Sequence, residues 1–218
     1  MTEKVSDSAD QVTAIDIVLE PDAGMVERAQ AANAGLRKNF PKGYRLDAEH
    51  KPHISVMGGY FYSVHLPKIH DAVQKTLGTE QVLSWKMQAV KYYYLPLPPI
   101  GLGGIVIQPT AGMIRLQKKL IDALAQYLSP TGSAAAFATT AADPTINEAT
   151  LHAVGTYFSE HTGEHYNPHV TIGVGTVEYL DALLAGPFAP FTFSAVGVSA
   201  YQFGNFGTAA KLLRAFNV

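Results

Sequence analysis

The sequence predicts an α+β fold with two similar halves, each a mostly antiparallel sheet with helices on its outer face, and a cleft between them. The first reason is a repeat: Ile15 to Gln30 aligns without gaps on Gly103 to Gln117 through Pro-x-Ala-Gly-Met, at an offset of 109 − 21 = 88. The second is that PHISV at 52–56 recurs as PHVTI at 168–172, at an offset of 169 − 53 = 116. The third is that the expected strands and helices follow the same order in both halves.

The first half is expected to form strand, helix, strand, helix and strand. The β-branched run Thr13 to Leu19 indicates a strand, and Asp22 is a suitable N-cap for a helix that ends near Lys38 at NFPKGY. The strand that carries PHISV comes next. A helix from Leu66 and a strand over 84–95 complete this half.

The second half repeats this order. IVIQ at 105–108 is the strand, and Thr110 caps a helix that runs to about Tyr127. The strand with PHVTI, a helix from Val177 and the strands 191–201 and 209–218 follow. The helix that Thr110 caps has apolar residues at helical spacing, which predicts a face in the core: Met113, Leu116, Leu120, Leu124 and Leu128.

We therefore expect residues 1–218 to form a single bilobal domain with duplicated halves at about 11–100 and 101–218. The second half has 28 extra residues between its repeats, and the Ala-, Thr- and Ser-rich segment 129–150 explains most of them. This segment is either a flap near the cleft or a tolerated insertion in a surface loop.

Composition excludes several classes of protein. A net charge of −2 without a block of Lys and Arg argues against binding to extended duplex nucleic acid. The absence of cysteine excludes disulfides, thiol nucleophiles and zinc sites built on Cys. No signal-peptide pattern and no apolar run of about 18 residues is present, so we expect a cytoplasmic monomer that does not contact a membrane.

The repeated motif places polar side chains on one face of each strand. Because side chains alternate along a strand, His53 and Ser55 share one face, and His169 and Thr171 do the same in the second half. The aliphatic residues between them would pack on helices. Two imidazoles and two hydroxyls are therefore expected to face one cleft.

This set of side chains suits phosphate chemistry. With an ordinary pKa of about 6.5, one imidazole can accept a proton while the other donates one. Hydroxyl groups can orient the non-bridging oxygens of a phosphate. The motifs indicate a site that cleaves phosphodiesters or opens cyclic phosphodiesters, with no metal and no cofactor.

The paired H-x-[ST]-x motifs at Pro52 to Val56 and Pro168 to Ile172 resemble those of the 2H phosphoesterase superfamily, which includes 2′-5′ RNA ligase-like proteins and cyclic nucleotide phosphodiesterases. The duplicated halves fit this resemblance over nearly the whole chain. It implies a bilobal fold, metal-independent catalysis, and nucleotide or RNA-end substrates with a 2′,3′-cyclic phosphate or a 2′-5′ linkage.

The resemblance also implies roles for the four motif residues. His53 would protonate the leaving ribose oxygen, His169 would activate water, and Ser55 and Thr171 would bind the phosphate. The chain departs from RNA ligase-like members after both motifs, where Gly58 replaces an aromatic residue and Gly173-Val174 replace a basic one. These departures favour a small nucleotide or an RNA end over a substrate as large as tRNA.

Two alternatives to a cyclic phosphodiesterase stay open. The first is a non-catalytic module that binds a nucleotide or RNA end in the same cleft. The second, a His-based metalloprotein, is disfavoured because no carboxylate or Cys ligands lie near the motifs in the sequence. Ligation of 2′-5′ linkages is the reverse of the same chemistry and would use the same residues.

Other residues receive weaker predictions. We expect tyrosines near strand ends to stack on a base or to pack in the core: Tyr60, Tyr92, Tyr94 and Tyr201. Asp16, whose repeat partner is Gly104, is expected at an exposed strand edge, with a role in orienting a histidine as the alternative. The remaining histidines are expected to be solvated: His50, His65, His70, His152, His161 and His165.

Overall fold

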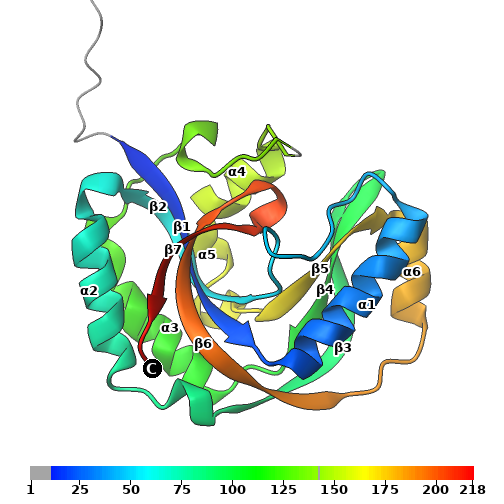
Figure 1. The fold of residues 1–218 in the computed structure, drawn as a ribbon, viewed down its shortest axis with the longest axis horizontal. Helices are drawn as coiled ribbons and strands as arrows, with labels where there is room; N and C mark the ends of the chain where they lie inside the picture. The colour runs from blue at the N-terminus through cyan, green and yellow to red at the C-terminus, as the bar shows by residue number, and fades with distance from the viewer. Residues whose placement is uncertain (1–10, 142) are drawn as a thin grey trace, which may run out of the picture.

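The fold is seen in a computed structural model that describes residues 11–141 and 143–218 (Figure 1). In the first half the elements are β1 (Val12–Pro21), α1 (Ala23–Asn39), β2 (Ile54–Tyr62), α2 (Leu66–Leu77) and β3 (Lys86–Leu97). In the second half they are β4 (Ile100–Ile107), α3 (Ala111–Leu124), α4 (Glu148–Gly155), α5 (Tyr157–Glu160), β5 (His169–Thr176), α6 (Val177–Ala185), β6 (Phe191–Phe203) and β7 (Ala209–Phe216). The 3₁₀ turns are η1 (Ser63–His65), η2 (Val82–Ser84), η3 (Ala125–Tyr127), η4 (Ala134–Ala136), η5 (Gly163–His165) and η6 (Asn205–Gly207).

The predicted α+β fold with antiparallel strands is confirmed. The strand order is β2-β1-β6-β3-β4-β5, β7 pairs with β6, and every pair is antiparallel. The two expected sheets are joined through β6, which pairs with β1 through 195–202 and with β3 through 191–194. A strand of 13 residues spans roughly 43 Å, which is long enough to serve both parts.

The two halves of the sequence exchange elements across the sheet. β3, from the first half, lies between β6 and β4, while β6, from the second half, lies between β1 and β3. The helices are exchanged as well, because α1 contacts β5 and α3 lies beside α2 and β2 (Figure 1). Each side of the molecule therefore contains elements of both halves, and the two His motifs come from different sides.

The repeated helix starts form as the sequence predicts. The Asp22 carboxylate accepts a hydrogen bond of 3.2 Å from the Met25 amide, and the Thr110 hydroxyl accepts one of 3.2 Å from the Met113 amide. These side chains satisfy amides that an α-helix leaves unpaired in its first turn. The four predicted core residues from Met113 to Leu124 are fully buried, but Leu128 lies beyond α3 and is only partly buried.

The insertion 129–150 packs against the sheet. Ala136 and Phe137 belong to a small buried cluster with Tyr60 and Phe203, and the Ala138 amide donates a hydrogen bond of 2.9 Å to the Phe203 carbonyl. This cluster lies apart from the main core. The insertion therefore covers the end of β6 and reaches the region where the motifs meet.

The helices between residues 11 and 218, leaving out residue 142, include none with the length and apolar character of a membrane span.

Candidate active site

All four motif residues, His53, Ser55, His169 and Thr171, line one cavity of about 380 Å³. Ser55 lies in β2, and His53 directly precedes this strand. His169 and Thr171 lie in β5. The structure therefore brings together the side chains that the motifs singled out.

A β-bulge follows each hydroxyl residue. The pairing of β2 with β1 skips Val56, directly after Ser55, and the pairing of β5 with β4 skips Ile172, directly after Thr171. A bulge leaves a residue without a partner in the ladder and bends the strand. Both motif strands therefore bend at the same place, where the polar pair meets the cavity.

A buried amide side chain supports each bulge. Gln117 of α3 donates a hydrogen bond of 3.0 Å to the Val56 carbonyl, and Asn33 of α1 donates one of 2.8 Å to the Ile172 carbonyl. Both amides are nearly fully buried. Neither amide belongs to a recognised motif, although a polar residue on the apolar face of Leu116 and Leu120 is a signal in the sequence that points to Gln117.

The first motif is tied to a buried carboxylate. The His53 Nδ1 lies 2.7 Å from the Lys51 carbonyl oxygen, and its Nε2 lies 3.4 Å from Oδ2 of Asp16. The Ser55 hydroxyl donates a hydrogen bond of 2.6 Å to the same Asp16 oxygen. Burial alone would lower the pKa of His53, but the hydrogen bond and charge of Asp16 raise it above its ordinary value.

The prediction that Asp16 lies at an exposed edge is wrong. The residue is 0 % exposed, because β1 lies between β2 and β6 inside the sheet. Ile15 and Ile17, on either side of Asp16, point into the main core. Because side chains alternate along a strand, the Asp16 carboxylate lies on the opposite face, where it meets the first motif.

The second motif has an aromatic neighbour in place of a carboxylate. The His169 Nδ1 lies 2.8 Å from the Asn167 carbonyl oxygen, and the Tyr93 ring meets the imidazole edge-on with centroids 4.9 Å apart. Burial lowers the pKa of His169 to about 4, and the positive charge of His53 acts in the same direction. The pKa of His53 is therefore raised and that of His169 lowered, relative to an ordinary imidazole.

Gly104, the repeat partner of Asp16, explains part of this asymmetry. Gly104 pairs with Thr171 across the β4–β5 ladder, and a Cβ atom added to it would lie 2.4 Å from the Tyr93 ring. No side chain, acidic or otherwise, fits there unless Tyr93 moves. The Thr171 hydroxyl makes no hydrogen bond to any residue in the described ranges, so it can donate into the cavity.

The four predicted substrate-binding tyrosines lie away from the cavity. Tyr60 and Tyr201 are buried, and their hydroxyls donate to the Leu151 carbonyl and to Glu20. The Tyr94 hydroxyl donates to Asp181.

Tyr92, the fourth, packs edge-on against Phe188. The tyrosines that line the cavity are Tyr93, Tyr157 and Tyr166. Alternation along β3 explains the difference, because Tyr93 lies on the opposite face from its two neighbours.

The histidines predicted to be solvated differ in their exposure: His152 and His165 are exposed, His65, His70 and His161 are half-buried, and His50 is buried. His161 and His165 line the cavity beside the second motif. His50 is buried, hydrogen-bonded to Asp47 at 3.2 Å and stacked on Tyr44 with ring centroids 5.2 Å apart. Their positions depend on the loops that precede β2 and β5, which have no periodicity from which a sequence could predict burial.

The turn η6 and the insertion close one end of the cavity. Phe206 has a φ of 56°, a left-handed conformation that is uncommon outside glycine, and its amide donates to the Thr150 hydroxyl at 2.9 Å. The Asn147 amide donates to Asn205 Oδ1 at 2.9 Å. These contacts hold Phe206 and Gly207 at the cavity, next to His53.

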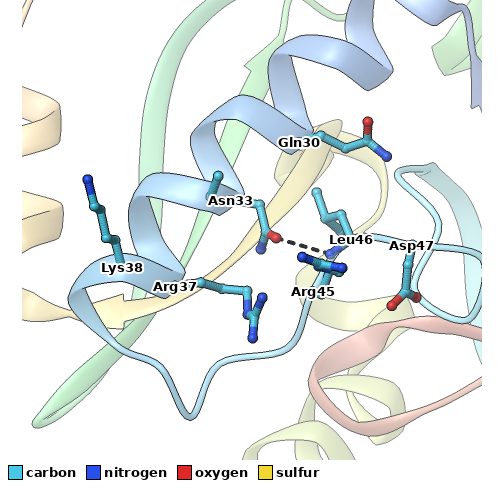
Figure 2. Close-up of a pocket in the computed structure, with 8 residues that line it drawn as sticks. Gln30, Asn33, Arg37, Lys38, Arg45, Leu46 and Asp47 are labelled. Carbon is cyan, nitrogen blue, oxygen red and sulfur yellow. Dashed lines mark hydrogen bonds between the residues drawn. The ribbon is translucent and has the colours of Figure 1, made fainter.

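The cavity and a second concavity differ in charge. The lining of the active-site cavity includes histidines and one carboxylate at its surface, Glu160, but no Lys or Arg among the described residues. The second pocket, of about 600 Å³, lies between α1 and the following loop and is lined by Arg37, Lys38 and Arg45 (Figure 2). Positive charge at the first site must therefore come from imidazole.

Metal ligation has no obvious site. Within residues 11–141 and 143–218, no three side chains of His, Asp or Glu gather closely enough to hold a metal ion. The two motif histidines also have their Nδ1 atoms directed at backbone carbonyls.

A comparison with solved structures supports the fold. The chain is similar to TT0787 of Thermus thermophilus, with 13 % identity, a TM-score of 0.56, and coverage of 94 % of this chain and 97 % of that one. It is also similar to LigT of E. coli, solved in complex with 3′-AMP, with 14 % identity, a TM-score of 0.46, and coverage of 96 % and 100 %. No curated protein sequence matches the chain.

The sequence itself matches the 2′-5′ RNA ligase superfamily over residues 20–202, a range that includes both His motifs. This match confirms the resemblance to 2H phosphoesterases that the paired motifs indicated. The chain belongs to the 2′-5′ RNA ligase superfamily.

Proposed function

We propose that this protein is a phosphoesterase that opens 2′,3′-cyclic phosphates, or cleaves 2′-5′ phosphodiester bonds, in nucleotides or RNA ends, by paired-histidine acid and base catalysis without a metal. The observation that carries the proposal is that both motifs line one cavity in opposite surroundings, His53 beside the carboxylate of Asp16 and His169 beside the ring of Tyr93. The pKa of His53 is raised and the pKa of His169 is lowered. Near neutral pH such a pair provides one acid and one base.

The division of labour follows from the ring contacts. The His169 Nδ1 carries its proton toward the Asn167 carbonyl, which leaves the Nε2 lone pair free to accept a proton from water. The activated water attacks phosphorus in line with the leaving ribose oxygen. His53, protonated on both nitrogens, donates a proton to this oxygen as its bond to phosphorus breaks.

The hydroxyls of the two motifs are not equivalent. Thr171 can donate a hydrogen bond to a non-bridging phosphate oxygen, whereas the Ser55 hydrogen is directed to Asp16. We therefore assign the main phosphate contact to Thr171. Because the Ser55 hydroxyl donates its hydrogen to Asp16, it cannot donate the same hydrogen to a phosphate oxygen.

The cavity suits the terminal part of a nucleotide. Its volume of about 380 Å³ is near the lower end for small-molecule sites. Apolar side chains such as Leu95, Leu102 and Phe206 line it beside the polar groups. This lining fits a base and ribose that carry one phosphate charge.

A non-catalytic binding module is the second candidate. The observation in its favour is that Asp16 already engages both polar side chains of the first motif, the Ser55 hydroxyl at 2.6 Å and the His53 Nε2 at 3.4 Å. This candidate predicts binding without turnover. The reverse reaction, ligation to a 2′-5′ linkage, would use the same residues and is a matter of equilibrium.

The decisive experiment measures release of monophosphate from nucleoside 2′,3′-cyclic phosphates in the presence of chelator. Intact protein is compared with His53→Ala, His169→Ala and the control His152→Ala, which removes an exposed histidine that does not line the cavity. We expect each motif variant to lose about 10²- to 10⁴-fold in rate and the control to be unchanged. Binding with no turnover by the intact protein, on cyclic and 2′-5′ substrates alike, would favour the binding module.

A further inference from the structure

We propose that Asp16 is a positioning residue that keeps His53 in its doubly protonated form and so fixes the first motif as the acid of the pair. The inference rests on the proposed function for its catalytic meaning. Its structural part, the protonation state of His53, can be tested without any substrate.

The contacts of His53 call for two protons on the ring. Its Nδ1 lies 2.7 Å from the Lys51 carbonyl oxygen, which can only accept, so this nitrogen carries hydrogen. Its Nε2 lies 3.4 Å from a carboxylate oxygen of Asp16. The negative charge beside Nε2 favours the imidazolium form, in which both ring nitrogens carry hydrogen.

The surroundings of Asp16 lead to the same conclusion. The residue is 0 % exposed, and its Oδ1 has no hydrogen-bond partner among the described residues. A buried carboxylate is costly unless a positive charge lies next to it. No Lys or Arg in the described part of the chain lines the cavity, and His53 is the cation within reach.

No other group around Asp16 and His53 can provide the positive charge that His53 places next to the carboxylate. Ser55 donates to Asp16 from β2, and Tyr157 from α5 and Tyr166 before β5 feel its charge but have strongly raised pKa values and stay neutral. The backbone of Gly207 in η6 also faces His53.

His169, on β5, is the remaining titratable neighbour, and burial keeps it neutral near pH 7 because its pKa falls to about 4. In this part of the cavity, the negative charge of the Asp16 carboxylate is therefore balanced by the positive charge of the His53 imidazolium.

The first test is the titration of His53 followed by NMR of labelled imidazole in the intact protein, Asp16→Asn and Asp16→Ala. We expect the His53 pKa to lie above 6.5 in the intact protein and below 6.5 in both variants, because burial then acts without opposition. His169 titrates at low pH in all three and serves as the internal control. A His53 that is neutral at pH 6 in the intact protein would overturn the proposal.

The second test is the pH profile of kcat/KM. With Asp16→Asn, the loss of activity relative to the intact protein should grow as the pH rises, because burial without the opposing carboxylate moves the alkaline limb to lower pH. A purely structural role would lower activity equally at every pH. An equal loss at every pH would contradict the role proposed for Asp16. If the intact protein shows no turnover at all, this counts against the proposed phosphoesterase function and not against the role of Asp16.

Ser55→Ala keeps the test valid if the Asp16 variants do not fold. This change removes the hydroxyl that donates to Asp16 and leaves the carboxylate beside His53. The carboxylate then interacts with His53 alone, so the His53 pKa should stay above 6.5 or rise. A fall of this pKa in Ser55→Ala would mean that the hydroxyl, and not Asp16, sets the protonation state.

A different observation supports a second inference: the basic pocket between α1 and the loop to β2 holds a backbone phosphate of a single-stranded RNA whose cyclic end occupies the cavity. Five of the 16 Lys and Arg residues fall within residues 37–51, directly before the first motif. Arg37, Lys38 and Arg45 line the pocket, and none lies within 4 Å of a carboxylate oxygen in the described residues (Figure 2).

A chain of contacts links the pocket to the active-site cavity. Asn33, which lines the pocket, donates to the Ile172 carbonyl next to Thr171 and to the Tyr44 carbonyl. The Tyr44 ring in turn lies 6.2 Å from the ring of Phe206 at the cavity. Asp47, the one acidic residue in the pocket lining, is already hydrogen-bonded to its own loop and to His50.

This inference also rests on the proposed function and predicts a preference by length. The test compares a nucleoside 2′,3′-cyclic phosphate with a tetranucleotide that ends in the same group, using intact protein, Arg37→Ala/Arg45→Ala, and the control Lys68→Ala/Lys75→Ala at two exposed positions of α2. We expect the pocket variant to raise KM about tenfold for the tetranucleotide only, and to reduce its dependence on salt.

Equal KM values for the two substrates in intact protein, or an equal rise for both in the pocket variant, would overturn this second inference. If neither substrate is turned over, the proposed function fails. Binding of the same tetranucleotide, measured by fluorescence anisotropy with the same variants, then still decides whether the pocket holds phosphate.

Discussion

The two His motifs have the same local architecture but opposite electrostatic surroundings. In both, the Nδ1 atom faces a backbone carbonyl and a bulge supported by a buried amide follows the hydroxyl residue. His53 then faces the carboxylate of Asp16, whereas His169 faces the ring of Tyr93. Duplication thus explains the geometry of the site, and a few unrepeated neighbours explain how two identical side chains come to differ in chemistry.

The comparison is tested most strongly by the pH dependence that each histidine controls. For the intact protein, kcat/KM should rise near pH 4 as His169 loses its proton, and fall above pH 6.5 as His53 loses its own. His169→Ala and His53→Ala should each lose about 10²- to 10⁴-fold in rate.

The pattern of the residual activity separates the two roles. His169→Ala should lack the acid limb and His53→Ala the alkaline limb, in profiles measured from about pH 3.5 to 9. The same limb lost in both variants would mean that the histidines do not divide acid and base as the structure suggests.

The hydroxyls provide a second contrast. Thr171→Val removes the donor that is free to bind phosphate, and a hydrogen bond to a charged group contributes about 1.5–3 kcal/mol, so we expect a loss of roughly 10- to 100-fold in kcat/KM. Ser55→Ala should lose less, because its hydrogen is directed to Asp16. Steady-state kinetics of both variants at pH 6 make the comparison, and a larger effect of Ser55→Ala would reverse the assignment.

The buried amide that supports the bulge after each motif can be removed in one half at a time. Gln117→Leu leaves the Val56 carbonyl without its donor, and Asn33→Leu does the same to Ile172. We expect each to lower the free energy of unfolding by about 1–3 kcal/mol, the cost of an unsatisfied buried group.

Denaturant unfolding measures this loss of stability, with Gln126→Leu as the control for an exposed amide near the end of the same helical segment. If the two amides support equivalent bulges, their effects should be similar. Unequal losses would show that the duplication is only approximate in energy.

The parts of the fold that repeat were predictable from the sequence. Helix caps Asp22 and Thr110, the apolar face of α3 and the polar face of each motif all follow from periodicity or from a short motif. The exchange of β3 and β6 between the halves could not be predicted from the sequence, because strand order depends on pairing between residues that are distant in the chain.

The asymmetric part of the site was equally hidden from sequence patterns. An isolated Asp in an apolar strand lies at an edge or in the interior according to its neighbours in the sheet, and only the structure shows that β1 is internal. Likewise, three consecutive tyrosines reveal that faces alternate but not which face meets the cavity.

The tyrosine run therefore provides the smallest and most local test of the comparison. Tyr93→Leu removes the ring that contacts His169, and an aromatic contact of this kind contributes about 0.5–1.5 kcal/mol beyond burial, so we expect a loss of roughly 2- to 10-fold in kcat/KM. Tyr94→Leu, one residue further and on the opposite face, should leave kcat/KM unchanged because Tyr94 does not line the cavity and its hydroxyl donates to Asp181. Removing the Tyr93 ring also admits water to the imidazole, so the acid limb in Tyr93→Leu should move from pH 4 toward 6.5. An acid limb that moves in Tyr94→Leu, or stays in place in Tyr93→Leu, would mean that something other than this ring keeps His169 neutral.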